Sequence, residues 1–117
     1  MTDHFGESCV KRGVTCCPKL LAANIKVAIR DGRDDLAEMV QADKEGGTAF
    51  YRVCYSPDGG LADLRQVGGD ALERMLYALC NSMTGTAITI YTQKMMSGKR
   101  YAKKRLSRGQ PVARILK

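Results

Sequence analysis

The separation of charges along the chain is the feature that most constrains how it can fold. Residues 1–93 carry ten basic and twelve acidic side chains, a net charge of −2, whereas residues 94–117 carry nine basic side chains and no acid. Blocks of like charge repel one another and often serve as interaction tails. We therefore expect a folded core in residues 16–93, a mobile leader in residues 1–15, and a basic segment, residues 94–117, that docks partly on the core.

The length and composition of the chain indicate one soluble domain. A chain of 117 residues fits a single core, and its apolar content of 44% and charged content of 26% are ordinary for a globular protein. The opening residues Met1–His4 are polar and acidic, unlike a secretory signal, and no apolar run approaches the ~20 residues that span a bilayer. We expect a cytoplasmic protein that does not enter a membrane.

The cysteine pattern favours reduced thiols. An odd number of cysteines without regular spacing is unlike a secreted disulfide scaffold, which has an even count. The five are Cys9, Cys16, Cys17, Cys54 and Cys80.

A helical stripe follows Pro18, which suits the first turn of a helix because its missing N–H is not needed there. Apolar residues recur at helical spacing over residues 21–29. The same spacing continues through Leu36, Met39 and Val40, after a break at Asp31-Gly32. A glycine inside a helix costs ~1 kcal/mol relative to alanine, so the pattern predicts two helices or one kinked helix, ending by Gly47.

A β-hairpin is predicted next. Residues 49–55 are rich in aromatic and other strand-favouring residues, and residues 56–60 provide turn-forming Pro, Asp and Gly. The return strand is expected over residues 61–67.

A third helix and a further strand complete the predicted core. Asp70 with Glu73 three residues later resembles a capping box, and the apolar stripe from Leu72 to Met83 has helical spacing. Residues 86–92 alternate as a strand does. The order α–β–β–α–β predicts a small α+β domain with helices packed on one face of a mainly antiparallel sheet. Val112, Ile115 and Leu116 would anchor the basic segment on it.

The basic segment is the candidate binding site. Concentrated positive charge attracts polyanions, and each phosphate neutralised by lysine or arginine releases counterions. Tyr101, among these cations, could stack a base, as could strand residues Phe50, Tyr51 and Tyr55, although core packing explains strand aromatics equally well. The candidate residues in the basic segment are Lys94, Lys99, Arg100, Tyr101, Lys103, Lys104, Arg105, Arg108 and Arg114.

Two candidate functions would depend on this positive charge. The first is a small nucleic-acid-binding accessory protein that contacts the DNA or RNA backbone. The alternative is a small inhibitor or adaptor of phage or mobile-element type that docks on an acidic or nucleic-acid-binding surface of a larger protein machine. The small size and the lack of enzyme motifs suit either role. The sequence specifies neither the oligomeric state nor a choice between DNA and RNA.

Catalytic, metal and cofactor sites have weaker support. The potential zinc ligands His4, Cys9, Cys16 and Cys17 lack the paired spacing of structural zinc sites. Cys17 precedes a helix start, which favours a thiolate, but no general base is in evidence near it. Acids clustered in residues 31–38 suit a helix N-terminus as well as a magnesium-dependent nuclease. We expect no cofactor, no metal and no enzymatic activity.

Overall fold

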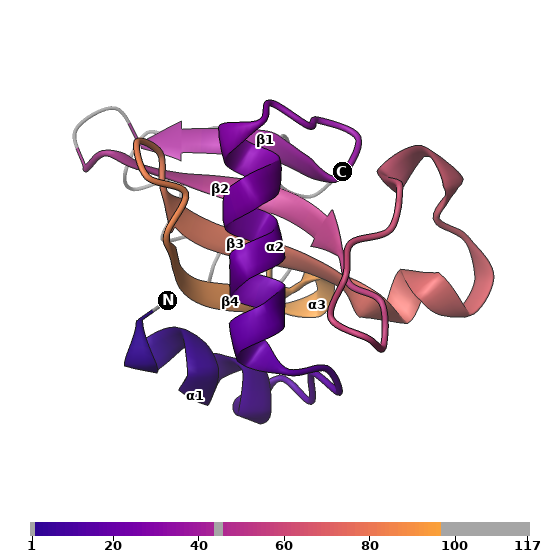
Figure 1. Ribbon diagram of the computed structural model, residues 1–117. Helices are drawn as coiled ribbons and strands as arrows, with labels where there is room; N and C mark the ends of the chain where they lie inside the picture. The colour runs from indigo at the N-terminus through magenta and orange to yellow at the C-terminus, as the bar shows by residue number, and fades with distance from the viewer. Residues whose placement is uncertain (1, 44–45, 97–117) are drawn as a thin grey trace.

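A four-stranded antiparallel sheet organises the protein. The computed structural model describes residues 2–43 and 46–96. Each strand pairs with the next along the chain, so the sheet is a meander (Figure 1). The strands are β1 (Ala37–Asp43), β2 (Thr48–Cys54), β3 (Met75–Asn81) and β4 (Ala87–Thr92). The predicted α+β class with an antiparallel sheet is confirmed.

The long helix α2 (Pro18–Arg30) crosses one face of this sheet (Figure 1). Proline occupies the start of the helix, as predicted, and the helix ends at Asp31, just before Gly32. The φ of Gly32 is +66°, a left-handed conformation that glycine adopts without steric cost. The predicted helix start at Pro18 and the break at Asp31-Gly32 are therefore confirmed.

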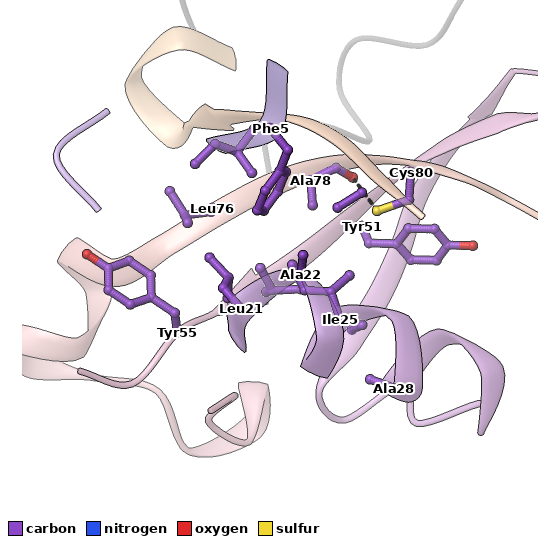
Figure 2. Close-up of a cluster of buried hydrophobic side chains, with 14 of the residues drawn as sticks. Phe5, Leu21, Ala22, Ile25, Ala28, Tyr51, Tyr55, Leu76, Ala78 and Cys80 are labelled. Carbon is purple, nitrogen blue, oxygen red and sulfur yellow. Dashed lines mark hydrogen bonds between the residues drawn. The ribbon is translucent and has the colours of Figure 1, made fainter. Parts of the chain in front are cut away.

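The main hydrophobic core lies between α2 and the sheet (Figure 2). Leu21 and Ile25 on α2 have no exposed surface, and they pack with strand residues such as Val53 and Ala78, which are also fully buried. Full burial of an aliphatic side chain stabilises the fold by roughly 1.5–3 kcal/mol. The small side chains of Ala22 and Ala28, also buried on α2, suit a close approach of this helix to the sheet.

The helix α1 (Asp3–Lys11) replaces the mobile leader predicted for residues 1–15, and that prediction is wrong for this helix. Phe5 and Cys9 are fully buried in the main core. Thr2 caps the helix by accepting from the Phe5 N–H, and it also donates from its own N–H to the Ala87 carbonyl. The helix was not predicted because few of its residues are apolar, and only Phe5, Ser8 and Cys9 are buried.

β1 occupies the place of the second predicted helix. Its apolar residues Met39 and Val40 mimic helical spacing because a β-bulge between Met39 and Gln41 interrupts the strand alternation. Val40 packs on the face of the sheet opposite α2, whereas Met39 is half exposed. The prediction of a helix in this segment is wrong.

The predicted hairpin from residue 49 to residue 67 is half correct. β2 forms where predicted, but residues 61–67 do not return as a strand. Only a single bridge joins Tyr55 to Leu61, after which a 3-10 turn follows at Leu64–Gln66. The partners of β2 are instead β1 and β3, which lie on its two sides.

β3 takes the place of the third predicted helix. A 3-10 helix at Gly69–Arg74 precedes the strand, so the expected capping box starts no α-helix. Leu76 and Ala78 face α2, and Tyr77 faces the other side of the sheet. Because both faces of this strand are buried, its sequence is an unbroken apolar run that periodicity cannot distinguish from a buried helix. The final predicted strand is confirmed as β4.

The short helix α3 (Gln93–Met96) follows β4 directly. Met96 packs with Phe50 and Tyr77 on the face of the sheet that α2 does not cover, which we call the second face. No helix among the described residues is long and apolar enough to cross a membrane.

The burial of Phe5 predicts that α1 is part of the cooperative fold. Phe5→Ala should lower the free energy of unfolding by about 3–5 kcal/mol, because it removes a fully buried aromatic ring and leaves a cavity. Val10→Ala on the exposed side of the same helix should change it by less than about 0.5 kcal/mol. Urea denaturation measures both, and equal effects would show that α1 is not integral to the core.

Candidate polyanion-binding surface

The predicted binding residues lie almost entirely outside the described part of the chain. Lys94 falls within α3, so the backbone of the basic segment is described for its first three residues. The remaining candidates, outside the described residues, are Lys99, Arg100, Tyr101, Lys103, Lys104, Arg105, Arg108 and Arg114. The apolar anchor predicted for residues 112–116 lies there too.

The second face of the sheet is the place from which the basic segment begins. Phe50, Tyr77 and Met96 are buried there, with exposed fractions of 4%, 1% and 1%. The Phe50 and Tyr91 rings lie 5.6 Å apart at an interplanar angle of 53°. This packing fixes α3 against the sheet.

A polar row runs beside this aromatic cluster. Arg52 on β2 is aligned with Glu38 on β1 and with Tyr77 on β3. Its guanidinium Nη2 lies 2.9 Å from the Glu38 carboxylate, while its Nε is buried without a hydrogen-bond partner. Burial raises the pKa of Tyr77, so the phenol stays neutral at physiological pH. The second face therefore combines one ion pair with a largely apolar surface.

The stacking platform suggested by the strand aromatics does not exist as an open surface. Tyr51 and Tyr55 belong to the main core and are about 95% buried, since their exposed fractions are 4% and 5% (Figure 2). Phe50, on the opposite side of the strand, is equally buried. None of the three rings presents a face to solvent, so core packing accounts for all of them.

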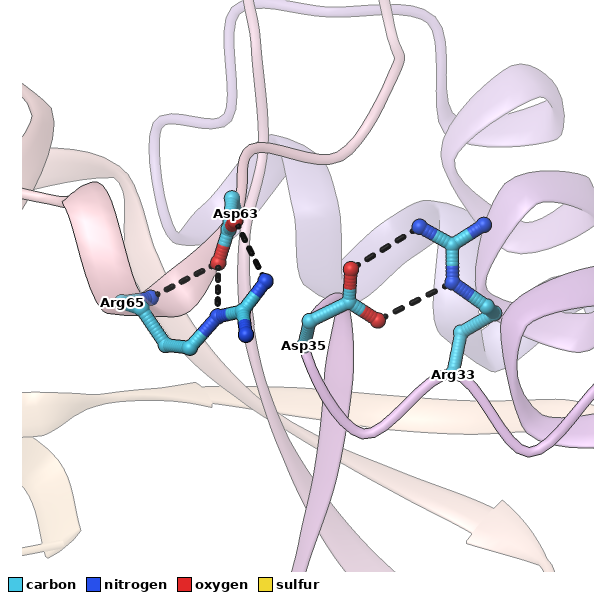
Figure 3. A network of polar contacts seen from close by, with 4 residues as sticks. All are labelled: Arg33, Asp35, Asp63 and Arg65. Atoms are coloured by element: carbon cyan, nitrogen blue, oxygen red, sulfur yellow. Dashed lines mark hydrogen bonds and ion pairs between the residues drawn. The ribbon is translucent and has the colours of Figure 1, made fainter.

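The acidic cluster predicted near residues 31–38 is divided between two places. Asp35 receives two hydrogen bonds from Arg33, of 3.0 Å and 2.8 Å, and this contact holds the pKa of the carboxyl below its usual value (Figure 3). Glu38 instead pairs with Arg52 on the second face. These acids do not meet in one cleft, as a nuclease site would require.

A matching pair lies beside Arg33 and Asp35. Asp63 accepts two hydrogen bonds from the Arg65 guanidinium, both of 3.1 Å, and one from its backbone N–H (Figure 3). Nearby, the Leu64 N–H donates to the Asp35 carbonyl at 2.7 Å, which ties the loop between β2 and β3 to the start of β1. Each ion pair is local to its own segment, and this backbone hydrogen bond joins the two segments.

The potential zinc ligands also differ in their burial. Cys9 and Cys16 are buried in the main core, and Cys17 is exposed. Across residues 2–43 and 46–96 there is no group of three or more His, Cys, Asp or Glu side chains able to hold a metal ion.

Cys17 is the cysteine whose thiol pKa is lowered, which favours the reactive thiolate. It is the N-cap residue of α2, and the backbone N–H groups of Leu20 and Lys19 lower its pKa. Burial has the opposite effect on the core thiols, raising the pKa of Cys9 to about 11 and that of Cys80 to about 12. The only histidine of the chain, His4, lies in a different helix, α1.

The cations of α2 are a surface that the sequence analysis did not single out. Lys19, Lys26 and Arg30 are exposed, and their spacing of seven and four residues places them along one side of the helix. A groove of about 400 Å³ lies beside Lys19 and Lys26. A second, smaller groove of about 110 Å³, beside Asn24 and Val27, is lined by both Asp31 and Arg33. The sequence feature that could have indicated this cationic surface is the absence of any acid between Pro18 and Arg30.

Comparison of the chain with protein-family models, with curated proteins and with solved structures found no match. The function is therefore inferred from the charges and geometry of this chain alone.

The pKa values predict selective alkylation of Cys17. Iodoacetamide reacts with the thiolate, and a lowered pKa increases the thiolate fraction at pH 7–8, whereas the raised pKa and burial of Cys9 and Cys80 suppress it. Mass spectrometry of the folded protein should show one rapid modification, which Cys17→Ser removes. In denaturant all five thiols should react, and equally rapid labelling of several thiols in the native protein would contradict the assignment.

Proposed function

We propose that this protein is a small nucleic-acid-binding accessory protein whose basic segment contacts the phosphate backbone of DNA or RNA. The observation that carries the proposal is the charge of residues 94–117, which hold nine basic side chains and no acid. A surface that serves only solubility mixes both signs of charge. A stretch with one sign favours contact with a polyanion.

The ion pairs of the core support this proposal. Three of its carboxylates already have arginine partners within the core, at nitrogen–oxygen distances of 2.8, 2.9 and 3.1 Å. These pairs are Asp35 with Arg33, Glu38 with Arg52, and Asp63 with Arg65. These three acids are engaged by arginines of the core, so they are not the partners of the basic segment.

The mechanism follows from the chemistry of lysine and arginine. Their contacts with phosphate oxygens position a protein on nucleic acid but read no base sequence. Each contact releases condensed counterions, so affinity falls steeply with salt. Tyr101 lies among the cations and adds a base-stacking contact when the nucleic acid is single-stranded.

The proposal also includes a cytoplasmic location and a binding role without catalysis. All five cysteines are free thiols, as suits a protein of the reducing cytoplasm. Three of the described acids engage arginines, and Asp35 and Glu38 lie in different parts of the fold, so we propose a binding protein without catalytic activity. An accessory factor of a phage or mobile element fits this character.

Neutralising part of the basic segment should weaken nucleic-acid binding and leave the fold intact. Changing Lys103, Lys104 and Arg105 to alanine removes up to three phosphate contacts. The slope of log affinity against log salt should then become shallower by about 2–3 for duplex DNA. Fluorescence anisotropy across a salt series measures the slope, and urea denaturation checks the fold.

The outcome also separates the alternatives. Failure of the intact protein to bind duplex or single-stranded nucleic acid at low salt would contradict the proposal. Saturable binding to a defined acidic protein would then support an inhibitor or adaptor. Unfolding of the triple variant would show instead that the segment is structural. A nuclease would require magnesium-dependent cleavage that Asp34→Ala or Asp35→Ala abolishes.

A further inference from the structure

The exposed side of α2 carries a row of cations that the core does not use. Lys19, Lys26 and Arg30, which we call the cationic stripe, lie on the side of the helix turned away from Leu21 and Ile25. At 1.5 Å per residue the stripe extends roughly 16 Å along the helix axis. No acidic residue interrupts it, because the sequence from Pro18 to Arg30 contains none.

No ion pair within the described residues involves the cationic stripe. The ion pairs found there use Arg33, Arg52 and Arg65, and none involves α2. Lysine and arginine on a helix commonly pair with an acid three or four residues away. The stripe lacks such partners, so its charge is directed to solvent or to a ligand.

A groove lies directly beside the stripe. Its lining includes three small residues, Ala22 and Ala23 on α2 and Ala87 at the start of β4, which leave room for a ligand to approach the backbone. Thr86 adds a hydroxyl group at the wall. Asp3 is the one acid in the lining, so the two lysines there outnumber it.

The wall of this groove is held against α2 by close packing. A side chain at Gly85, in the turn between β3 and β4, would lie 3.3 Å from both the Cα and the carbonyl oxygen of Lys26. The φ of Gly85 is +77°, a conformation that glycine adopts at no steric cost. The turn between β3 and β4 therefore approaches the backbone of α2 closely at Lys26, with little room for a larger residue at position 85.

We propose that the cationic stripe and its groove form a second contact surface for the phosphate backbone of a nucleic-acid duplex. The inference depends on the proposed function and extends it from the basic segment to the core. A stripe of this length covers about five phosphates of one strand, measured along the duplex axis. A single small anion would engage only one or two of its cations.

The surface is suited to the backbone and not to the bases. α2 has no aromatic side chain on which a base could stack. Its one amide, Asn24, donates a hydrogen bond to the Gly59 carbonyl at 2.9 Å and is held by that loop. Contacts from lysine and arginine therefore dominate, which makes binding by the stripe independent of base sequence.

The two contact surfaces can be separated by mutation. The basic segment begins at α3, whose Met96 packs on the second face of the sheet, whereas α2 covers the opposite face. Substitutions in the stripe thus leave the surroundings of α3 unchanged.

A triple substitution in the full-length chain tests the inference. Lys19→Gln, Lys26→Gln and Arg30→Gln lower the net charge by three without touching a buried residue. The matched control changes three other exposed cations, Lys11, Arg33 and Arg65, to glutamine, so its net charge is the same. Arg33 and Arg65 are ion-paired with Asp35 and Asp63, but exposed pairs of this kind contribute little to stability. The probe is a fluorescein-labelled DNA duplex of about 20 base pairs, long enough to exceed the stripe.

The stripe variant should bind the duplex about 10-fold or more weakly at 0.1 M salt, with a salt slope shallower by about 2–3. The control should change binding much less, and both should keep the urea midpoint of the parent protein. Equal weakening of the two variants would overturn the inference, because net charge alone would then explain the loss. Unchanged binding by the stripe variant would also overturn it.

The same measurements separate this inference from the proposed function. If the Lys103, Lys104 and Arg105 variant loses affinity while the stripe variant does not, the basic segment alone binds and only the second surface is rejected. If the parent protein binds no duplex, both are rejected. Loss of affinity in each variant, with a larger loss when they are combined, supports two surfaces.

Discussion

The burial of one side of α2 against the sheet is the interaction on which the rest of the structure depends. Leu21 and Ile25 are removed completely from water at this contact, and they hold the helix in a fixed rotation about its own axis. Because one side of a helix is fixed in the core, the residues on the other side are committed to solvent. The same contact that stabilises the fold therefore determines where Lys19, Lys26 and Arg30 lie.

The sequence predicted α2, which has one buried side, and missed β3, which is buried on two. α2 alternates between core and solvent, so its spacing and Pro18 identified it. β3 packs against the main core through Leu76 and against the second face through Tyr77, so its apolar run has no strand period. The bulge in β1 had a similar effect, because one extra residue converts a strand alternation into apparent helical spacing.

The sequence predicted the positive charge of the basic segment, but it did not single out the cations on α2. The basic segment stands out in the sequence because it lacks acids over residues 94–117. The cations of α2 are separated by neutral residues, and their average density in the chain is unremarkable. Their spacing places them on one side of α2, and the burial of Ala22 and Ala28 together with the exposure of Lys26 shows that this side faces solvent. Spatial charge patterns of this kind depend on which side of a helix the core occupies.

The contact between the start of α1 and β4 has a consequence for self-association. β4 is an edge strand, and its outward carbonyls at Ala87 and Ile88 accept hydrogen bonds from the backbone and hydroxyl of Thr2. An unprotected edge recruits strands from other molecules and promotes aggregation. At the opposite edge, the bulge in β1 breaks the regular ladder that an incoming strand needs. Both edges of the sheet therefore carry features that hinder β-pairing between molecules.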